Sequence, residues 1–439
     1  MQTLRERSTG YRRRWTSPWI VVLAVLVLAA GGGVAYALVG ASPSTTLECA
    51  KGVSCSTRPA GAAATARQSK GARADAAHTF DVASTSPANG AAAVPSNARL
   101  TVTFTAPIVS GGQTPTLSPT VTGNWRRSGT KAMVFTPSAP FVPFTKYTLS
   151  VPGGRHGVQG VAGAHLAKTD TVTFTIAPGS TLRLQQLLAA LGYLPLSTNA
   201  PTPPPRDMAT AQPGTFTWRW PGLPAELTDQ WVPGAANALT KGAVMMFETE
   251  NSLPVDGVAG PQVWTALLAD VSAHKANTEP LSYVLVTKAL PQHLTAWVNG
   301  TLALRDVLVN TGVPGATTHV GTFQVFEHVP FSDMKGTNVT GTTYTDPHVP
   351  WASYFNGGDA LHGFPRAHYG FPQSNGCVEM RITTAAKLWP YTPVGTLVTV
   401  IGPSQTPPAP PTTTTTTAPP TTTTTSTAPP TTTTTAASG

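Results

Sequence analysis

The apolar run from Trp19 to Ala41 constrains this 439-residue chain more than any other feature of its sequence. No charged residue interrupts it, and at about 1.5 Å of rise per residue a helix over 19–41 can span the hydrocarbon core of a bilayer. Five arginines and a single glutamate lie among the first fourteen residues, and basic flanks of this kind stay on the cytoplasmic side. We therefore predict a cytoplasmic basic tail over 1–18, a transmembrane anchor over 19–41, and export of all that follows.

A cleaved signal peptide is the alternative for this N-terminal region. Ala35-Tyr36-Ala37 resembles the small-residue site at which such peptides are cut. The apolar run is longer than the usual core of a signal peptide, which favours a retained anchor. Under both interpretations the remainder of the chain lies outside the cytoplasm.

The chain has three cysteines, an odd number for an exported protein, in which cysteines normally pair. Cys49 and Cys55 flank a short loop and either close a small disulfide or remain as two thiols in a flexible stalk. Cys377 is left over. An unpaired thiol in an exported protein is a candidate for chemistry.

The composition indicates several β-domains joined by loose linkers. Charged residues make up only 11% of the chain, while it contains 40 glycines and 43 prolines. We predict a flexible stalk over 42–78 and a disordered tail over 403–439, where Pro and repeated Thr match the mucin-like class that can carry O-glycans. The net charge of +9 suits an anionic wall polymer better than nucleic acid, because no basic stretch is interleaved with aromatic residues.

Residues 79–178 show the alternation of half-buried strands, separated by Pro and Gly turns. Leu100, Val102 and Phe104 form one such run, and 172–176 form another. The pattern predicts a small β-sandwich. Its opening segment, STSPANGAAAVPSNARLTVTF, resembles the bacterial Ig-like domains of surface proteins, which implies a spacer role.

Residues 179–272 change to a helical rhythm. Leucines recur at helical spacing from Leu184 to Leu191 behind Ser180, a candidate N-cap. A second helix should place Leu239, Ala243, Met246 and Phe247 on one side, and a third short helix should lie within 253–268. LQQLLAALGYLP together with FETENSLPVDGVAGPQVWTALL resembles peptidoglycan-binding domains of the three-helix type, split by a Pro-rich insertion over about 199–233; a generic helical spacer is the alternative.

Strand patterns return over 279–402. We predict strands over 283–286, 294–298 and 301–309, with Asn299-Gly300 as a two-residue hairpin turn between the last two. A short helix over 385–389, capped by Thr384, should precede a final strand over 396–401. The domain is therefore expected to be rich in β-structure.

The segment LHGFPRAHYGFPQSNGCVEM, over 361–380, concentrates residues that can carry chemistry. Cysteine attacks as the thiolate, so it needs an imidazole nearby to take its proton, and backbone N–H groups to hold the oxyanion that forms. His362 can supply the imidazole for Cys377. Gly376 lets the backbone approach a substrate closely, and the N–H groups around it are candidates for the oxyanion hole.

His362-Gly363 followed by Ser374, Gly376 and Cys377 resembles the His-Gly and Ser-x-Gly-Cys signature of the YkuD-type L,D-transpeptidases. TGVPGATTHVGTFQVF and VPWASYFNGGDALHGF are also similar to the family, and the resemblance covers 281–402. It implies a cell-wall enzyme in which the cysteine attacks a tetrapeptide stem of peptidoglycan, releases D-Ala, and passes the acyl group to an amine of a neighbouring stem. It also implies acylation by carbapenems, and we expect no cofactor and no metal.

Two residues depart from the family pattern. Asn375 stands where a His is common, and Glu379 where an Arg is usual, which Arg381 could partly replace. The family orients its His through a backbone carbonyl. Asp359 is a carboxylate alternative, although its position favours a turn.

Four further residues are candidates with two interpretations each. His368 is either a second imidazole at the pocket or a solvated loop residue. Tyr354, Phe355 and Asn356 either line the donor pocket or belong to the core.

Two other functions compete with transpeptidation. With water as the acceptor, the same site would be an L,D-carboxypeptidase. Asn375 and Glu379 also allow a wall-binding protein with weak catalysis. A Cys-His hydrolase that cleaves stems is disfavoured by the order of the two residues. The common cysteine peptidases of cell walls place Cys before His, whereas here His362 precedes Cys377, as in the transpeptidases.

Overall fold

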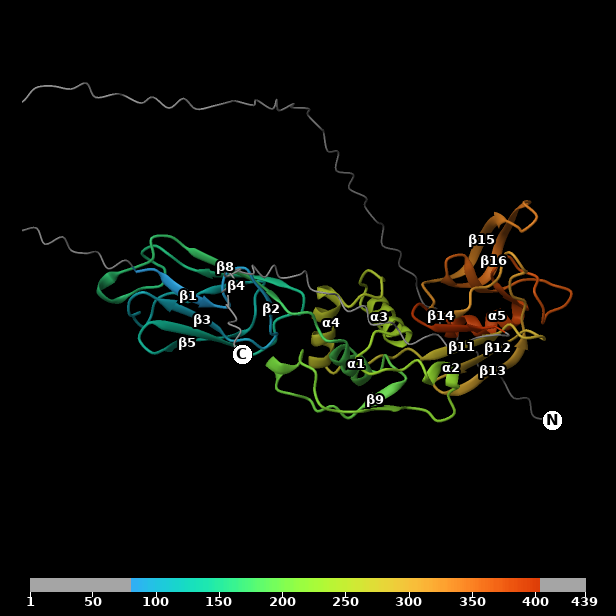
Figure 1. The fold of residues 1–439 in the computed structure, drawn as a ribbon, viewed down its shortest axis with the longest axis horizontal. Helices are drawn as coiled ribbons and strands as arrows, with labels where there is room; N and C mark the ends of the chain where they lie inside the picture. The colour runs from blue at the N-terminus through green and yellow to red at the C-terminus, as the bar shows by residue number, and fades with distance from the viewer. Residues whose placement is uncertain (1–79, 403–439) are drawn as a thin grey trace, which may run out of the picture. The chain divides into compact units, whose positions relative to one another are not determined.

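A computed structural model describes residues 80–402 (Figure 1). The predicted basic tail, anchor, stalk and Thr/Pro tail, with Cys49 and Cys55, lie outside the described residues. Within 80–402, no helix combines the length and the apolar composition needed to cross a bilayer.

Residues 82–176 form two four-stranded sheets that share one hydrophobic core. Side chains alternate strictly along the central strands: Leu100, Val102 and Phe104 are at most 1% exposed, while the threonines between them are half-buried. The predicted Ig-like β-region is thus confirmed. In spatial order the strands of one sheet are β1 (Val82–Ser86), β3 (Leu100–Phe104), β6 (Ala132–Pro137) and β5 (Gly123–Ser128). Those of the other are β2 (Ala91–Val94), β8 (Asp170–Ile176), β7 (Lys146–Val151) and β4 (Thr116–Ser118).

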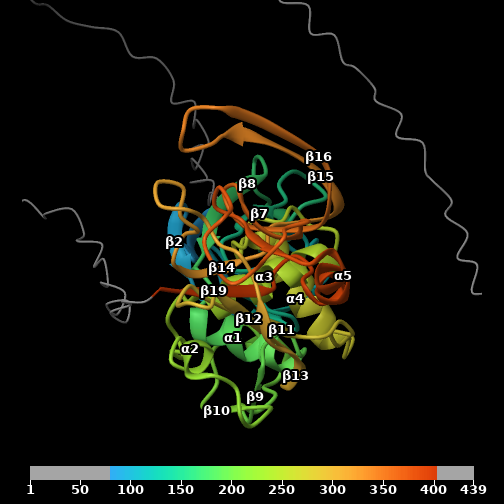
Figure 2. The ribbon, with the colours of Figure 1, turned by 90° about the vertical axis from the view of Figure 1, so that its right-hand side faces the viewer.

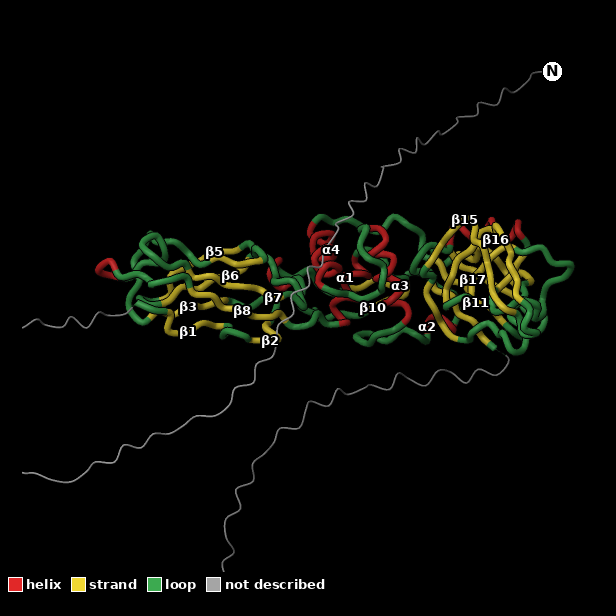
Figure 3. The backbone as a smooth tube through the Cα atoms, turned by 90° about the horizontal axis from the view of Figure 1, so that it is seen from above, coloured by secondary structure: helices red, strands yellow, loops and turns green. Residues whose placement is uncertain are grey.

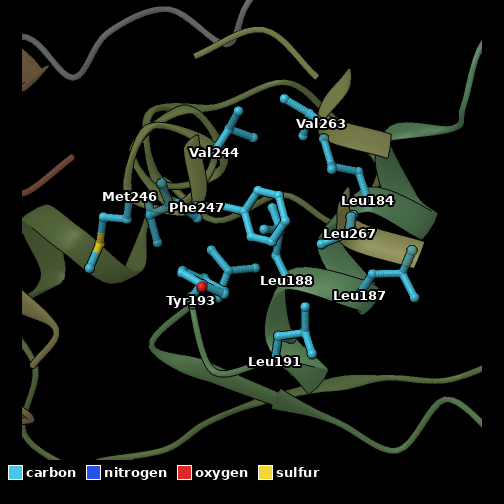
Figure 4. Close-up of a cluster of buried hydrophobic side chains, with 14 of the residues drawn as sticks. Leu184, Leu187, Leu188, Leu191, Tyr193, Val244, Met246, Phe247, Val263 and Leu267 are labelled. Atoms are coloured by element: carbon cyan, nitrogen blue, oxygen red, sulfur yellow. The ribbon is translucent and has the colours of Figure 1, made fainter. Parts of the chain in front are cut away.

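The helical region contains α1 (Thr181–Ala190), α3 (Ala238–Glu250) and α4 (Pro261–Ser272). Ser180 caps α1 as predicted, because its hydroxyl accepts the Arg183 N–H at 3.1 Å. The predicted apolar stripes meet in one core, where the Phe247 ring lies among leucines of α1 (Figure 4). The Pro-rich insertion contributes the paired strands β9 (Leu196–Thr198) and β10 (Phe216–Trp218), the short helix α2 (Ala225–Thr228) and one 3₁₀ turn (Pro205–Asp207).

The helical core continues into the strands that follow it. Leu281, Tyr283 and Leu397 belong to the same cluster of buried side chains as the helices. Gly242 of α3 comes so close to the carbonyl oxygen of Gly395 that a Cβ there would lie 2.5 Å from it. Small residues permit this approach of one backbone to another.

Residues 282–401 contain a five-stranded sheet in the order β13, β12, β11, β19, β14. Their bounds are Ser282–Thr287 for β11, His293–Val298 for β12, Thr301–Leu308 for β13, Gly321–Gln324 for β14 and Leu397–Ile401 for β19. The predicted turn between β12 and β13 is confirmed: Asn299 and Gly300 have φ of 48° and 73°, the left-handed values that a type I′ turn requires.

A second sheet of this region, with four strands, carries the residues of interest (Figure 2; Figure 3 marks its strands in yellow). The long hairpin of β15 (Glu327–Thr337) and β16 (Thr343–Asn356) leads to β17 (Asp359–Gly363), which pairs in parallel with β18 (Val378–Met380). Helix α5 (Ile382–Leu388) follows, then a 3₁₀ turn (Trp389–Tyr391).

The predicted start of this last helix was wrong. Arg381 is the N-cap of α5, without a side-chain cap, and Thr384 lies inside the helix with its N–H bonded to the Arg381 carbonyl. The chain turns into the helix directly after Met380 ends β18, so Thr384 comes too late to cap it.

Candidate active site

The pairing of β17 with β18 brings the two principal candidates to one face of a sheet. Leu361 lies opposite Val378, and His362 lies opposite Glu379. Cys377 comes directly before β18, two residues before Glu379, so the alternation of side chains along a strand predicts it on the same face as Glu379 and His362. The loop over 364–376 leaves β17 after His362 and Gly363 and returns to Cys377 just before β18.

His362 is only 2% exposed, and its backbone neighbour fixes the orientation of the ring. Its Nδ1 lies 3.2 Å from the Gly363 carbonyl oxygen. A carbonyl only accepts, so this contact assigns the proton to Nδ1 and leaves Nε2 with a free lone pair. Burial lowers the pKa of His362, which keeps the ring neutral and able to act as a base.

Cys377 is half-buried and is a free thiol in the described part of the chain. Its Sγ donates to the Gly358 carbonyl oxygen at 3.4 Å. Burial raises the pKa of the thiol to about 12, helped by the charges of Asp359 and Glu379 and opposed by a backbone hydrogen bond from Ala360. The two shifts favour the thiol form of Cys377 and the neutral form of His362.

Ser374 and Gly376 shape the turn that presents the thiol. The Ser374 hydroxyl donates to the Cys377 carbonyl at 2.5 Å and accepts the Gly376 N–H at 3.3 Å, so this N–H already has a partner within the loop. Gly376 has a φ of +122°, and a Cβ on it would lie 2.5 Å from Asp359 Oδ1. Only glycine fits this position.

Asp359 holds a neighbouring loop instead of His362. Its Oδ2 accepts the backbone N–H of His319 at 3.1 Å and the His319 Nδ1 at 2.7 Å. The carboxylate is 7% exposed, whereas the His319 side chain is 67% exposed. His319 was not singled out from the sequence, because nothing local connects it to a residue forty positions later.

Glu379 is paired with Arg366, a residue that the sequence did not indicate. Arg366 Nε lies 2.8 Å from one carboxylate oxygen of Glu379, and Nη2 lies 2.7 Å from the other. Arg381, the expected substitute for the family arginine, stacks instead over the ring of Tyr369 at 5.1 Å.

The aromatic candidates separate into core and site. Phe355 is 3% exposed and packs against Phe323, so it belongs to the core. Burial raises the pKa of Tyr354, its 2.8 Å hydrogen bond with Ser332 opposes the shift, and the charge of a Cys377 thiolate adds to it. Burial also raises the pKa of Tyr344 of β16; the Cys377 charge adds to this shift, and a hydrogen bond with the Asn375 side chain opposes it.

The two remaining candidates are Asn356 and His368. Asn356 pairs with Asp359 at the turn between β16 and β17. The side chain of His368 is exposed on the loop, where its carbonyl accepts hydrogen bonds from Asn310 and Gln373.

Three family models match separate parts of the chain. A bacterial Ig-like domain matches residues 76–176, a putative peptidoglycan binding domain matches 229–267, and an L,D-transpeptidase catalytic domain of the YkuD type matches 282–400. No curated protein matches the chain significantly. The domain limits predicted from the sequence stay predictions.

Solved structures with similarity to the chain are L,D-transpeptidases. One from Mycobacterium smegmatis is 15% identical, with 73% of this chain and 99% of that chain covered and a TM-score of 0.25. L,D-transpeptidase 3 from Mycobacterium tuberculosis is 13% identical, with coverage of 73% and 98% and a TM-score of 0.26. The catalytic domain of the Enterococcus faecium enzyme, acylated by ertapenem, is 26% identical over 29% of this chain and 100% of that chain, with a TM-score of 0.25.

The motif residues on paired strands and the family match over the same segment lead to one assignment. Residues 282–400 are a YkuD-type L,D-transpeptidase catalytic domain, in a chain that also carries a bacterial Ig-like domain and a peptidoglycan-binding domain.

Proposed function

We propose that this protein forms crosslinks between stem peptides of peptidoglycan through a thioester on Cys377. The observation that supports the proposal is the β17–β18 pairing, in which His362 lies opposite Glu379, two residues after Cys377, while the Gly363 carbonyl accepts from His362 Nδ1. A base with its lone pair on Nε2 suits a thiol that is protonated at rest.

The first half of the reaction transfers the acyl group to the enzyme. As Sγ attacks the carbonyl between the L-centre and the D-centre of a tetrapeptide stem, the thiol proton passes to His362 Nε2. The C–N bond to the terminal D-Ala then breaks, and the imidazolium returns the proton to the departing amine. A thioester and free D-Ala result.

The second half regenerates the thiol. An amine of a neighbouring stem attacks the thioester carbonyl, His362 takes the proton from that amine, and the C–S bond breaks as Sγ is reprotonated. The product is a new amide between two stems. Water in place of the amine would give a shortened monomer, which is the L,D-carboxypeptidase alternative.

Two features support an acyl donor in the cell wall. The chain carries a peptidoglycan-binding domain beside the catalytic domain, which fits an extracytoplasmic enzyme acting on peptidoglycan. The charge of a Cys377 thiolate acts on Tyr344 and Tyr354, and Asn375 lies two residues before Cys377, so these three side chains can offer hydrogen-bonding groups to a peptide stem. Anchoring in the membrane through residues 19–41 is part of this proposal.

The deciding experiment incubates residues 80–402 with a purified disaccharide tetrapeptide and follows the products by mass spectrometry. We expect a crosslinked dimer and free D-Ala from the wild type and neither from Cys377→Ala. His362→Ala should lower the rate about 10²- to 10⁴-fold, the usual contribution of a general base. A hydrolysed monomer without dimer would favour the carboxypeptidase, and no D-Ala at all would refute both activities.

Carbapenem labelling locates the nucleophile independently. The wild type should gain the mass of one drug molecule, and Cys377→Ala should gain none. One of the similar structures, from Enterococcus faecium, is a catalytic domain acylated by ertapenem. Labelling that persists in Cys377→Ala would place the nucleophile elsewhere.

A further inference from the structure

The ion pair between Arg366 and Glu379 is close in the chain to the proposed catalytic pair, because Glu379 comes two residues after Cys377. Glu379 is 4% exposed and lies opposite His362 in the β17–β18 register. Both of its carboxylate oxygens are bound by one guanidinium, at 2.8 and 2.7 Å. Bidentate pairs of this kind fix geometry as well as charge.

Arg366 also connects the two ends of the loop over 364–376. Its backbone N–H donates to the Tyr369 hydroxyl at 3.2 Å, and its Nη2 lies 3.5 Å from the Gln373 carbonyl. The guanidinium stacks over Phe364 at 4.7 Å from the ring centroid. One side chain thus ties the start of the loop, its end and strand β18 together.

The same stack reaches the imidazole. The Phe364 ring meets the His362 ring edge-on, with centroids 5.9 Å apart and planes at 85°. On the other side, the backbone of Glu379 exchanges two hydrogen bonds of 2.9 Å with Asn310. The Asn310 side chain in turn accepts the Gly370 N–H at 3.0 Å. The loop is therefore held by Asn310 as well as by the pair of Arg366 with Glu379.

We propose that Arg366 and Glu379 are a positioning pair that holds the 364–376 loop and the His362 ring in the arrangement from which Cys377 attacks. Within the pair, the Arg366 guanidinium compensates the negative charge that Glu379 brings near Cys377. The inference deepens the proposed function and rests on it for the roles of Cys377 and His362.

The charges around the site agree with this arrangement. Glu379 raises the pKa of His362, whereas Arg366 lowers it. Glu379 and Asp359 both raise the pKa of Cys377; Asp359 is paired with His319 and Glu379 with Arg366. Asp346 also acts on His362, and Tyr344 and Tyr354 face the thiol.

The test measures the pH dependence of Cys377 alkylation by iodoacetamide in the full chain, quantified on the peptide that carries Cys377. Arg366→Gln leaves Glu379 uncompensated, so we expect the profile to move to higher pH by about one pH unit, or about tenfold slower alkylation at a fixed pH below the midpoint. Glu379→Gln should move the alkylation profile to lower pH, while D-Ala release still falls because the ion pair no longer holds the loop. Arg366→Lys keeps the positive charge but cannot bind both carboxylate oxygens in the same way, so it should keep the alkylation profile and lower kcat.

The charge-swapped double variant, Arg366→Glu with Glu379→Arg, separates positioning from folding. We expect it to release D-Ala faster than either single variant. Lys275→Gln, which breaks the 3.1 Å pair with Asp270 in the helical region, is the matched control and should change neither readout. If both single variants fail to fold, recovery of folded protein by the swap supports the pair, and its failure overturns it.

An Arg366→Gln profile that coincides with the wild type, or a swap no more active than the single variants, would also overturn the inference. The two proposals fail separately. If the wild type releases no D-Ala, the proposed function is refuted and the D-Ala comparison of the swap no longer applies. The alkylation profiles of the Arg366 and Glu379 variants, which need no turnover, then decide on the positioning pair alone.

Discussion

The chemistry of single residues in this site is set by burial. Burial raises the pKa of the Cys377 thiol and lowers that of the His362 imidazole, because removal from water penalises the thiolate and the imidazolium alike. These shifts disfavour a preformed thiolate–imidazolium pair, so in the proposed reaction we expect the proton to move as the substrate is attacked. Local geometry, and Gly376 above all, then decides whether the thiol is presented correctly.

Replacing Gly376 by Ala should cost both stability and reactivity. The positive φ alone costs about 1 kcal/mol, and the new Cβ would also clash with Asp359 Oδ1 at 2.5 Å. Gly341→Ala is the matched control, since Gly341 also has a positive φ, of +83°, but open space around it. Thermal denaturation and Cys377 alkylation should separate the two variants, with only Gly376→Ala losing alkylation. Equal effects would show that backbone strain alone matters.

At the scale of elements, α3 carries a buried carboxylate that ties a helix to the turn after it. Glu248 is 0% exposed, and its Oε2 accepts the N–H groups of Asp256 and Gly257 at 3.1 and 2.8 Å. Its Oε1 is buried without a partner. Burial raises the pKa of Glu248 to about 7, while the Gly257 hydrogen bond opposes the shift.

The raised pKa makes this helical region less stable as the pH rises. Between its ordinary value of 4.5 and about 7, the folded carboxyl keeps a proton that the unfolded chain has released, so stability falls through this window. Glu248→Gln keeps an acceptor for both N–H groups and should remove this slope from the melting temperature. Glu279→Gln, an exposed carboxylate, is the control. A variant with the same slope as the wild type would contradict the assignment.

Elements governed by local chemistry could be predicted from the sequence. Ser180 caps α1 and Asn299-Gly300 turns between β12 and β13, because a cap or a type I′ turn depends on the residues at that position. Thr384 failed as a cap, since where α5 begins depends on where β18 ends.

The site was predictable only where the motif is local in sequence. His362 and Cys377 follow from spacing and the Ser-x-Gly-Cys context. Arg366 and His319 do not, because each pairs with a carboxylate brought close by the return of a loop or the packing of another strand. Charge complementarity between Arg366 and Glu379 was visible in the same segment and was the one signal that could have found the pair.

At the scale of the molecule, the helical region and the catalytic domain share buried surface. Leu281, Tyr283 and Leu397 pack into the helical core, and Gln324 Nε2 donates to the Ala238 carbonyl at 3.1 Å. The Ig-like region has a core of its own. Truncation between the Ig-like and helical regions should therefore affect stability less than truncation between the helical region and the catalytic domain.

A chain cut to residues 178–402 should melt close to the temperature of residues 80–402. A chain cut to 280–402 exposes three large apolar side chains, each worth about 1.5–3 kcal/mol when buried, so its melting temperature should fall by at least about 10 °C. Differential scanning calorimetry measures this, and binding of an apolar dye reports the exposed surface. Equal melting temperatures for all three chains would show that the catalytic domain does not depend on the helical core.

The protonated thiol of Cys377 also bears on how long the enzyme lasts outside the cell. Peroxides oxidise the thiolate and not the thiol, and an exported protein lacks the thioredoxin and glutathione that repair cytosolic cysteines. In the proposed reaction the thiol ionises when a donor stem arrives, so we expect it to be oxidised slowly between turnovers. The burial that lowers the reactivity of Cys377 toward its donor should then also slow its oxidative inactivation.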